Sequence, residues 1–457
     1  MTKILIRGAT LVTMGASGDL PGADLLVDGD RIAAISSAAA GCGEAPGLAL
    51  QSDEIVDARG CIVIPGLVNA HMHTWQTALR GLAANWTLLE YFQKMHAGLA
   101  KVFTPDDLHI ATLAGALNQL NCGTTTLADW CHNNPTPAHN DAAIAALLRS
   151  GIRAAFFHGT PKPAPTPGER PFWEVPHPRV ELQRLIDAHV REPLLTVHAA
   201  VLGPHYSTLD VALHDFRMAR ELGVVASLHQ GGGPPRTPDG WQRLEAEGLL
   251  GPHVNIVHGH ALDDAQLKHF CELGMTFSVA AENEMTQGHG HPVTGRLREF
   301  GRAPSLGVDL ESVLSGDMLT QARVALGMQR TLDNAAHRAQ HGGIPSTSTV
   351  TTRQALAWVT VEGARMLGQL DRIGTLEVGK QADLVVIRAD ALNMQPVHDA
   401  VNSVVMQASI GNIDSVMVAG RWKKRDGRLL GVELAPLLQH LTASGRRITQ
   451  ALGLASR

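Results

Sequence analysis

The sequence lacks several features that define other classes of protein. Its five cysteines are odd in number and form no Cys-x-x-Cys pair, which excludes a disulfide framework and is typical of a reduced, intracellular protein. No run of about 18 apolar residues occurs, and the first residues alternate apolar and polar types instead of forming a signal sequence. With 38 Lys and Arg against 43 Asp and Glu, the net charge is −5. These absences predict a cytoplasmic protein without a nucleic-acid or membrane partner.

Aromatic residues are scarce as well, at 4% of the chain, whereas histidine is abundant. There are 23 histidines beside 9 phenylalanines and 2 tyrosines, so a metal site is worth seeking. The overall content, 44% hydrophobic and 18% charged, is that of a globular protein and excludes a disordered chain, a collagen or a coiled coil. At 457 residues the chain can form one large domain with an appendage, or two or three domains.

Eight apolar segments between residues 65 and 309 have the composition of buried β-strands. Helix-like segments separate them, and some of these stop at a glycine, as at Gly151 and Gly223. Eight strand–helix repeats over about 250 residues predict a (β/α)8 TIM barrel, whose parallel strands are buried and continuously apolar. The predicted strands are 65–70, 124–129, 154–158, 194–201, 224–229, 254–258, 275–279 and 304–309.

Short strand patterns occur at both ends of the chain, outside this repeat. Neither end is long enough to form a core alone, so we expect both to meet in one small β-sandwich domain of an α/β protein. The predicted organisation is a sandwich part at 1–64, the barrel at 65–381, a second sandwich part at 382–432 and a C-terminal helix at 433–457. A Gly-, Ala- and Pro-rich insert at 36–50 is expected to be a loop of the sandwich. The helix is expected to pack on the barrel through Leu434, Leu437, Leu438, Leu441, Ile448 and Leu452.

Histidines and an aspartate end four of the predicted barrel strands. Residues i and i+2 of a strand point to the same side, so His71 and His73 can both face the barrel axis. His229, His258 and Asp309 end the fifth, sixth and eighth strands, at the face where such barrels hold their active sites. Imidazole and carboxylate suit a divalent ion such as Zn²⁺. A single histidine at a strand end is more often structural, and it is the coincidence at four strand ends that favours a metal.

A series of motifs resembles the amidohydrolase superfamily, most closely its branch of cytosine-deaminase-like enzymes and triazine hydrolases (chlorohydrolases). The motifs are 65–73 (PGLVNAHMH), 203–205 (GPH), 227–229 (SLH), 256–259 (IVHG), 307–309 (GVD) and 374–383 (GTLEVGKQAD), and they follow in the family's order. The resemblance covers nearly the whole chain. It implies a barrel with a sandwich, one divalent metal ion (zinc, with iron, manganese or cobalt as alternatives) and a homo-oligomer, a dimer or larger.

The resemblance also implies roles for individual residues. The metal ion would be held by His71, His73, His229 and Asp309, while His205 would contact the substrate. Asp309 is placed to accept the proton of the attacking water and to pass it to the leaving group. His258 would polarise the substrate oxygen, and its alternative role is that of a structural imidazole.

The fourth strand bears on the number of metal ions. Members of the superfamily with two metal ions use a carboxylated lysine there, whereas 194–201 (LLTVHAAV) has no lysine. Lys162 follows the third strand in a Pro-rich loop, and we expect it to be a solvated loop residue. One metal ion is therefore predicted.

The fifth strand departs from the family pattern in a way that bears on the reaction. Deaminases of this branch usually have a glutamate three residues after the strand-5 histidine, whereas here the stretch is 229–233 (HQGGG). Loss of that acid favours hydrolysis of an amide, urea or carbamate-like C–N bond, which is the preferred prediction. The alternative is deamination or dechlorination of an aminated or halogenated N-heterocycle (a purine, pterin, pyrimidine or triazine). A further alternative is an inactive barrel that binds a ligand.

Several other residues are candidates for contact with a small-molecule substrate. Glu282 or Glu284 could supply the missing acid, although a solvated loop carboxylate is the alternative for both. His291 belongs to the loop 288–292 (GHGHP). Trp75 could form a wall for a flat ring or pack in the core, as could Trp86 and Trp130. The predicted substrate contacts are His205, Trp75, Glu282 and His291.

Overall fold

The computed structural model describes residues 2–37, 52–451 and 453. Apart from residues 36 and 37, the predicted loop at 36–50 lies outside the described residues. The density of internal contacts divides the chain into two units. One comprises Met1–Asn69, Asn118–Thr126 and Asp317–Val432, and the other comprises Ala70–Leu117, Leu127–Gly316 and Glu433–Arg457. The domain boundaries that we predicted from the sequence stay predictions.

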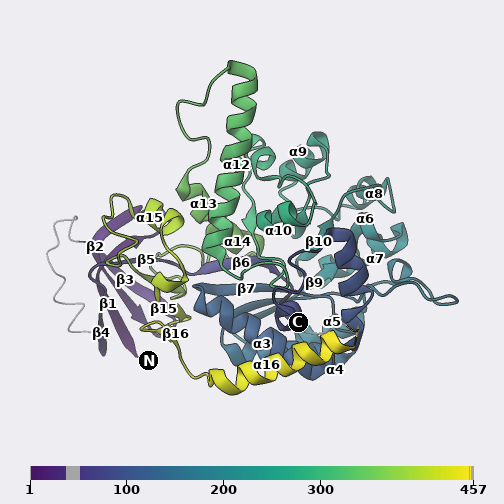
Figure 1. The fold of residues 1–457 in the computed structure, drawn as a ribbon, viewed down its shortest axis with the longest axis horizontal. Coiled ribbons are helices and arrows are strands. Elements are labelled where there is room, and N and C mark those ends of the chain that lie inside the picture. Colours follow the sequence, from purple (N-terminus) through teal and green to yellow (C-terminus); the bar gives the residue numbers. More distant parts are fainter. Residues whose placement is uncertain (1, 38–51, 452, 454–457) are drawn as a thin grey trace. The chain divides into compact units, whose positions relative to one another are not determined.

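Eight strands form the predicted barrel sheet, and they follow one another in chain order (Figure 1). An isolated parallel bridge between Met72 and Asp309 joins the first strand to the residues that follow the eighth, so the ring is nearly closed. The strands are buried over almost their whole length, and polar residues such as Asp129 and Arg153 are buried among their apolar ones. They are β6 (Leu67–Met72), β7 (Thr124–Cys131), β8 (Arg153–His158), β9 (Leu195–Val201), β10 (Ala226–Gln230), β11 (Val254–His258), β12 (Thr276–Val279) and β13 (Ser305–Leu306).

Helices alternate with these strands along the chain. Gly151 ends α4 with φ 70°, and Gly223 follows α7 with φ 65°, so both predicted glycine stops adopt the left-handed conformation that glycine tolerates. The helical elements in this region are η2 (Thr74–Leu79), α2 (Leu88–Tyr91), η3 (Phe92–His96), η4 (Leu99–Val102), α3 (Pro105–Asn121), α4 (Pro137–Ser150), η5 (Phe172–Glu174), α5 (Arg179–His189), α6 (Gly203–Tyr206), α7 (Leu209–Glu221), α8 (Gly240–Ala246), α9 (Asp264–Glu272), α10 (Ala281–Thr286) and α11 (Thr294–Glu299).

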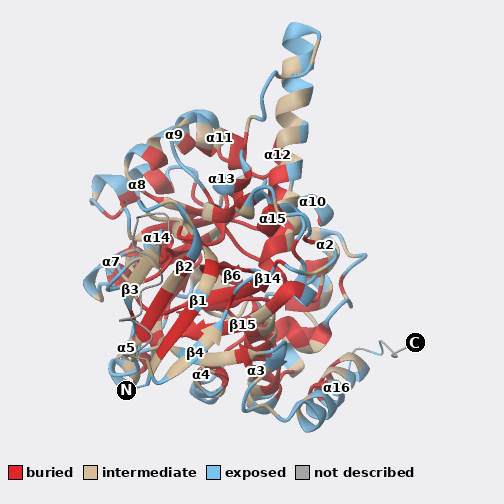
Figure 2. Ribbon diagram, turned by 90° about the vertical axis from the view of Figure 1, so that its left-hand side faces the viewer, coloured by how far each residue is buried: buried red, intermediate tan, exposed pale blue. Residues whose placement is uncertain are grey.

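Strands from both ends of the chain form one nine-stranded sheet, as the sequence predicts. The two ends meet where β14 pairs antiparallel with β5, from Leu384 opposite Pro65 to Arg388 opposite Cys61. Residues from both ends share one apolar core, and Figure 2 shows β1 and β14 buried. The strands are β1 (Lys3–Val12), β2 (Asp19–Asp28), β3 (Arg31–Ser37), β4 (Glu54–Asp57), β5 (Cys61–Pro65), β14 (Leu384–Arg388), β15 (Ile413–Val418), β16 (Arg421–Arg425) and β17 (Arg428–Leu429).

The chain ends in the predicted helix, α16 (Leu434–Gln450). Leu441 and Ile448 are buried, and Leu441 packs with Ile110 and Ala114 of α3. Leu434 and Leu438 are 48% and 49% exposed, so the prediction that they pack on the barrel is wrong.

The remaining helices are α12 (Met318–His341), α13 (Thr352–Trp358), α14 (Val361–Met366), α15 (Ala400–Met406) and η6 (Ile410–Asn412). No helix of the described residues has the length and apolar character needed to cross a membrane.

The barrel strand β7 contains a buried carboxyl group, that of Asp129. Its Oδ1 accepts hydrogen bonds from Thr74 N at 3.2 Å and Thr74 Oγ1 at 2.8 Å, while Oδ2 is buried without a hydrogen-bond partner in the described part of the chain. Burial outweighs the hydrogen bonds from Thr74 and raises the pKa of Asp129 to about 7. The folded protein therefore keeps a proton that the unfolded chain releases above about pH 4.

We expect Asp129 to make the protein less stable as the pH rises from about 4 to about 7, because the unfolded state binds fewer protons over that range. The shift from 3.8 to about 7 corresponds to a cost of up to about 4 kcal/mol above pH 7. Asp129→Asn should raise the thermal unfolding midpoint, and by more at about pH 8 than at about pH 5.5. A gain that does not grow with pH would show that the carboxyl group titrates normally.

Candidate metal centre and active site

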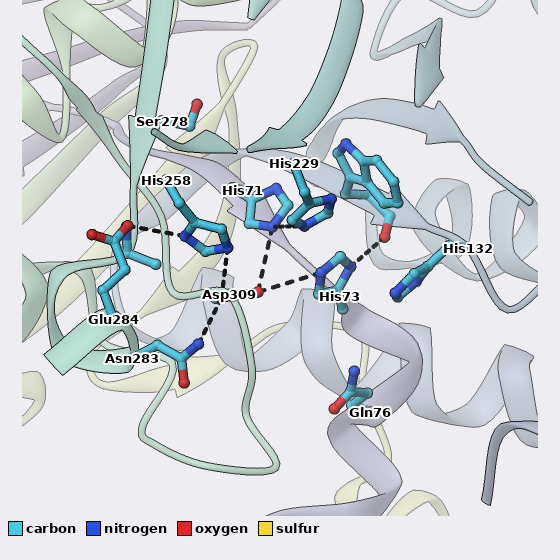
Figure 3. Close-up of polar contacts among 12 residues, drawn as sticks. His71, His73, Gln76, His132, His229, His258, Ser278, Asn283, Glu284 and Asp309 are labelled. Carbon is cyan, nitrogen blue, oxygen red and sulfur yellow. Dashed lines mark hydrogen bonds and ion pairs between the residues drawn. The ribbon is translucent and has the colours of Figure 1, made fainter. Parts of the chain in front are cut away.

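Four potential metal ligands converge at the carboxyl ends of three barrel strands (Figure 3). His71 lies on β6 and His73 directly follows it, His229 lies on β10, and Asp309 follows β13. His71 Nε2 lies 3.2 Å from His229 Nε2, and Asp309 Oδ1 lies 3.3 Å from Nε2 of both His71 and His73. One ligand atom from each of the four residues lies within 4.8 Å of all the others. The predicted ligand set is thus brought together in space.

The spacing and chemistry of this cluster fit a divalent ion. Ligand atoms about 2.1 Å from a tetrahedral zinc ion lie about 3.4 Å from one another, close to the separations seen here. Burial lowers the pKa of His73 to about 3 and also lowers those of His71 and His229, so the three rings are neutral and offer lone pairs. His73 Nδ1 lies 2.6 Å from the carbonyl oxygen of Trp130 and must donate to it, which leaves Nε2 to face the cluster.

The backbone at two strand ends adopts a conformation that non-glycine residues seldom use. His258 has φ 69° and Asp309 has φ 67°, both left-handed. Asp309 is held there by backbone hydrogen bonds, since its N–H donates to His71 O and its carbonyl accepts from His73 N. Gly307 permits this close approach, because a Cβ at Gly307 would lie 2.4 Å from His71 O. Such strain is typical of functional sites, where surrounding contacts fix it.

The two carboxylate oxygens of Asp309 have different neighbours. Oδ1 faces the histidine cluster, whereas Oδ2 accepts a hydrogen bond of 2.7 Å from Asn283 Nδ2 and lies 3.7 Å from His258 Nε2. Burial alone would raise the pKa of Asp309, but the hydrogen bond from His71 and the nearby imidazoles hold it below its usual range. Asp309 is therefore an ionised carboxylate that faces the cluster and the pocket together.

His258 is oriented by a buried carboxylate from α10. Glu284 Oε1 lies 3.0 Å from His258 Nδ1 and also accepts from Ala280 N at 2.9 Å. Burial lowers the pKa of His258, but Glu284 and Asp309 outweigh it and raise that pKa. Glu284 is fully buried, so the alternative that it is a solvated loop carboxylate is wrong. It acts on the imidazole of His258 and not at the pocket surface.

A pocket opens over the cluster, with a space of about 470 Å³ including its mouth. Flat side chains form much of its wall, among them Tyr91, Phe92, His96 and His132. The ring of His132 stacks on that of His73, with centroids 4.3 Å apart. The complete lining consists of His73, Leu88, Tyr91, Phe92, His96, His132, Lys162, Tyr206, His229, Gly231, His258, Asn283, Gln287, His289, Asp309 and Leu310.

Among the described residues, none of the four predicted substrate contacts belongs to this lining. Trp75 is fully buried behind the wall, where its Nε1 donates to His132 Nδ1 at 3.2 Å. His205 lies behind Tyr206, and His291 is exposed, two residues beyond His289. Glu282 is partly exposed, one residue before Asn283. As substrate contacts, these four stay predictions.

Lys162 is the clearest departure from the sequence expectation. The prediction of a solvated loop lysine is wrong, because its side chain lines the pocket. Its Nζ lies 5.5 Å from the ring centre of Trp130 and 5.3 Å from that of Tyr206. Burial lowers the pKa of Lys162 to about 8, and the charge of Asp309 opposes that shift. Lys162 thus contributes an ammonium group to the pocket lining.

Comparison with known proteins tests the resemblance seen in the motifs. A model of the amidohydrolase family matches residues 62–423. The 8-oxoguanine deaminase of Pseudomonas aeruginosa is 29% identical over 98% of this chain and 100% of its own length. The 5-methylthioadenosine/S-adenosylhomocysteine deaminase of Desulforudis audaxviator is 27% identical over 98% of this chain and 100% of its own length.

Solved structures agree on the fold. A mutant of atrazine chlorohydrolase from Arthrobacter aurescens TC1, complexed with zinc and atraton, superposes with a TM-score of 0.83, at 23% identity and over 97% of this chain and 100% of its own. An adenosine deaminase from Xanthomonas campestris with bound zinc gives a TM-score of 0.82, at 23% identity and over 98% of this chain and 99% of its own. The predicted fold class, a TIM barrel with a smaller sheet built from both chain ends, is confirmed. The chain belongs to the amidohydrolase family, and the prediction of a hydrolytic enzyme that acts on C–N bonds is confirmed.

Proposed function

We propose that the protein is a deaminase with one bound metal ion, which removes ammonia from a flat, aminated N-heterocycle. The observation that carries this proposal is a wall of flat side chains directly over the four converging ligand groups. Aromatic and imidazole faces favour a planar ring. Relatives that match over their full length and are named as deaminases support the same choice.

The proposed roles follow from the contacts of each side chain. His71, His73, His229 and Asp309 would hold the ion, for which we propose zinc, since three imidazoles and one carboxylate suit it. Such an ion supplies Lewis acidity and lowers the pKa of a bound water to about 7. Asp309 would take one proton from the attacking water and deliver it to the amino group, which leaves as ammonia when the C–N bond breaks. The second proton of the water passes from the new hydroxyl group to the ring nitrogen, so the products are the oxo-heterocycle and ammonia. His258, held by Glu284, presents Nε2 to the reacting group.

A second candidate function is hydrolysis of an amide, urea or carbamate-like bond, which the sequence alone favours. Its support is Gly232, which stands where deaminases of this type usually have a glutamate. A Cβ at Gly232 would make only an ordinary contact of 3.5 Å with His260 Nε2, so the backbone position itself does not require glycine for lack of space. A planar amide needs no proton on a ring nitrogen, whereas a heterocycle does.

An ammonia assay on the metal-loaded protein separates the two candidates. We expect release from at least one of 8-oxoguanine, guanine, 5-methylthioadenosine and an aminotriazine, and none from phenylurea or benzamide. The reverse pattern would replace deamination by the second candidate. Release of chloride from a chlorotriazine, without ammonia, would instead indicate dechlorination.

Several further predictions from the sequence also stand as proposals. We propose a cytoplasmic protein that acts on a small molecule and needs neither nucleic acid nor membrane, as charge and cysteine content favour. We also propose a homo-oligomer, a dimer or larger, as the family resemblance implies. The domain boundaries at residues 64, 381 and 432 belong to the same set of proposals.

A further inference from the structure

Lys162 brings the only ammonium or guanidinium group to the pocket lining, as far as the structure describes it. The segment that carries it lies between β8 and η5. Rings from two other elements hold its Nζ, since Trp130 belongs to β7 and Tyr206 to α6, at 5.5 Å and 5.3 Å. Contact with two aromatic faces stabilises a cation at this position. The side chain therefore lies against two aromatic walls of the pocket.

No carboxylate of the described residues forms an ion pair with Lys162. The single acidic residue of the described pocket lining is Asp309. Both of its oxygens are engaged, Oδ1 with His71 and His73 and Oδ2 with Asn283. The charge of Lys162 is thus left for a group that enters the pocket, and a divalent ion in the cluster would add to the positive potential there.

Gly231, the first of the three glycines after His229, contributes to this arrangement. A Cβ at Gly231 would lie 2.2 Å from the Tyr206 hydroxyl oxygen, so only glycine lets Tyr206 occupy its place in the wall. Tyr206 in turn supports Lys162. The segment that lacks the expected glutamate therefore also leaves room for the ring that contacts Lys162.

We propose that Lys162 is a substrate-binding residue that recognises an anionic oxygen of the substrate, either an ionised ring oxygen of an oxo-heterocycle or a carboxylate attached to the ring. A lysine ammonium with three N–H donors and no neutralising partner is suited to such an oxygen. The proposal deepens the proposed function and rests on it only in placing the substrate over the metal cluster. With Lys162 in this role, the pocket selects those flat N-heterocycles that carry a negative charge.

The test measures binding of unreactive probes by calorimetry on the metal-loaded full chain, so it does not depend on turnover. The probes form two pairs, urate with hypoxanthine and nicotinate with 3-acetylpyridine, and in each pair only the first is anionic near pH 7. Wild-type protein should bind at least one anion more tightly than its neutral partner, by about 10- to 100-fold, as expected for a hydrogen bond between charged groups. Preference for urate indicates a ring oxyanion, and preference for nicotinate indicates a carboxylate.

Three variants assign the preference to Lys162. Lys162→Met should abolish the preference for the anion and leave the affinity for the neutral partner within about twofold, whereas Lys162→Arg should keep part of it. Lys94→Met is the matched control, because Lys94 also lies over a tryptophan ring, at 5.0 Å from Trp86, but is paired with Glu90. Circular dichroism and metal content verify that each variant is folded and loaded.

Two results would overturn the proposal. One is an unchanged preference in Lys162→Met, which would mean that the metal ion or another group binds the anion. The other is a wild-type protein that binds both members of each pair equally, or neither anion at millimolar concentration. Failure of the ammonia assay would contradict the proposed reaction and leave these affinities as they are, so the two failures are distinguishable.

Discussion

Asparagine in place of Asp309 is expected to lower kcat by about 100- to 10,000-fold, the usual contribution of a positioned proton acceptor. The amide has nearly the same shape, so it can still accept from Asn283 or face His71, but it cannot take a proton from water. Folding should be retained, because the backbone of Asp309 makes the hydrogen bonds that hold this segment. Steady-state kinetics, with metal content and thermal midpoint measured on the same sample, check the result.

Asp106→Asn is the matched control for this change. Asp106 is an exposed carboxylate on α3 whose partner is His440, outside the pocket. Its kinetics should equal those of wild type. If Asp309→Asn regains full activity when excess zinc is supplied, Asp309 serves only as a metal ligand and its role as proton acceptor is wrong.

Removal of the metal ion is also expected to have a large effect. We expect about one equivalent of ion per chain in the purified protein, complete loss of turnover on chelation and recovery when Zn²⁺ is returned. Removal of the ion leaves three neutral imidazoles and one carboxylate buried together, with neighbouring ligand atoms only 3.2 to 3.3 Å apart. An ion present at 1,000 times its Kd would stabilise the fold by about 4 kcal/mol, so the thermal midpoint should fall on chelation.

Mg²⁺ provides the control for this experiment, since it prefers six oxygen ligands and should not restore activity. Two ions per chain would contradict the single cluster found among the described residues. A folded protein that is active without any ion would rule out metal-assisted hydrolysis. A folded protein that binds no ion and is inactive would instead support the alternative of a barrel that only binds a ligand.

The ligand cluster could be predicted from the sequence because it depends on the barrel topology. Once His71, His229 and Asp309 are assigned to strand ends, the closure of the sheet brings them together whatever the loops do. The period-2 geometry of a strand likewise puts His73 on the same side as His71. These positions follow from regular structure.

The pocket wall could not be predicted in the same way. Lys162 comes from an irregular segment, and its position is set by rings of Trp130 and Tyr206 that are remote in sequence. The loop 288–292 was singled out, yet a short-range pattern does not tell whether His289 or His291 turns inward. Glu284 could have been recognised from the sequence, because helical spacing in the segment after β12 predicts that it is buried on α10. Its carboxylate contacts His258, which ends the neighbouring strand β11.

The closure of the barrel ring has a consequence for the binding and release of a metal ion. The contacts that close the ring are the backbone hydrogen bonds between His71, His73 and Asp309, and these same three residues carry ligand groups. We therefore expect the ligand set to assemble only when the last strand meets the first, so that a metal ion binds late in folding. We also expect release of a bound ion to require opening of the ring at this junction, so that the rate of metal exchange would report on that opening.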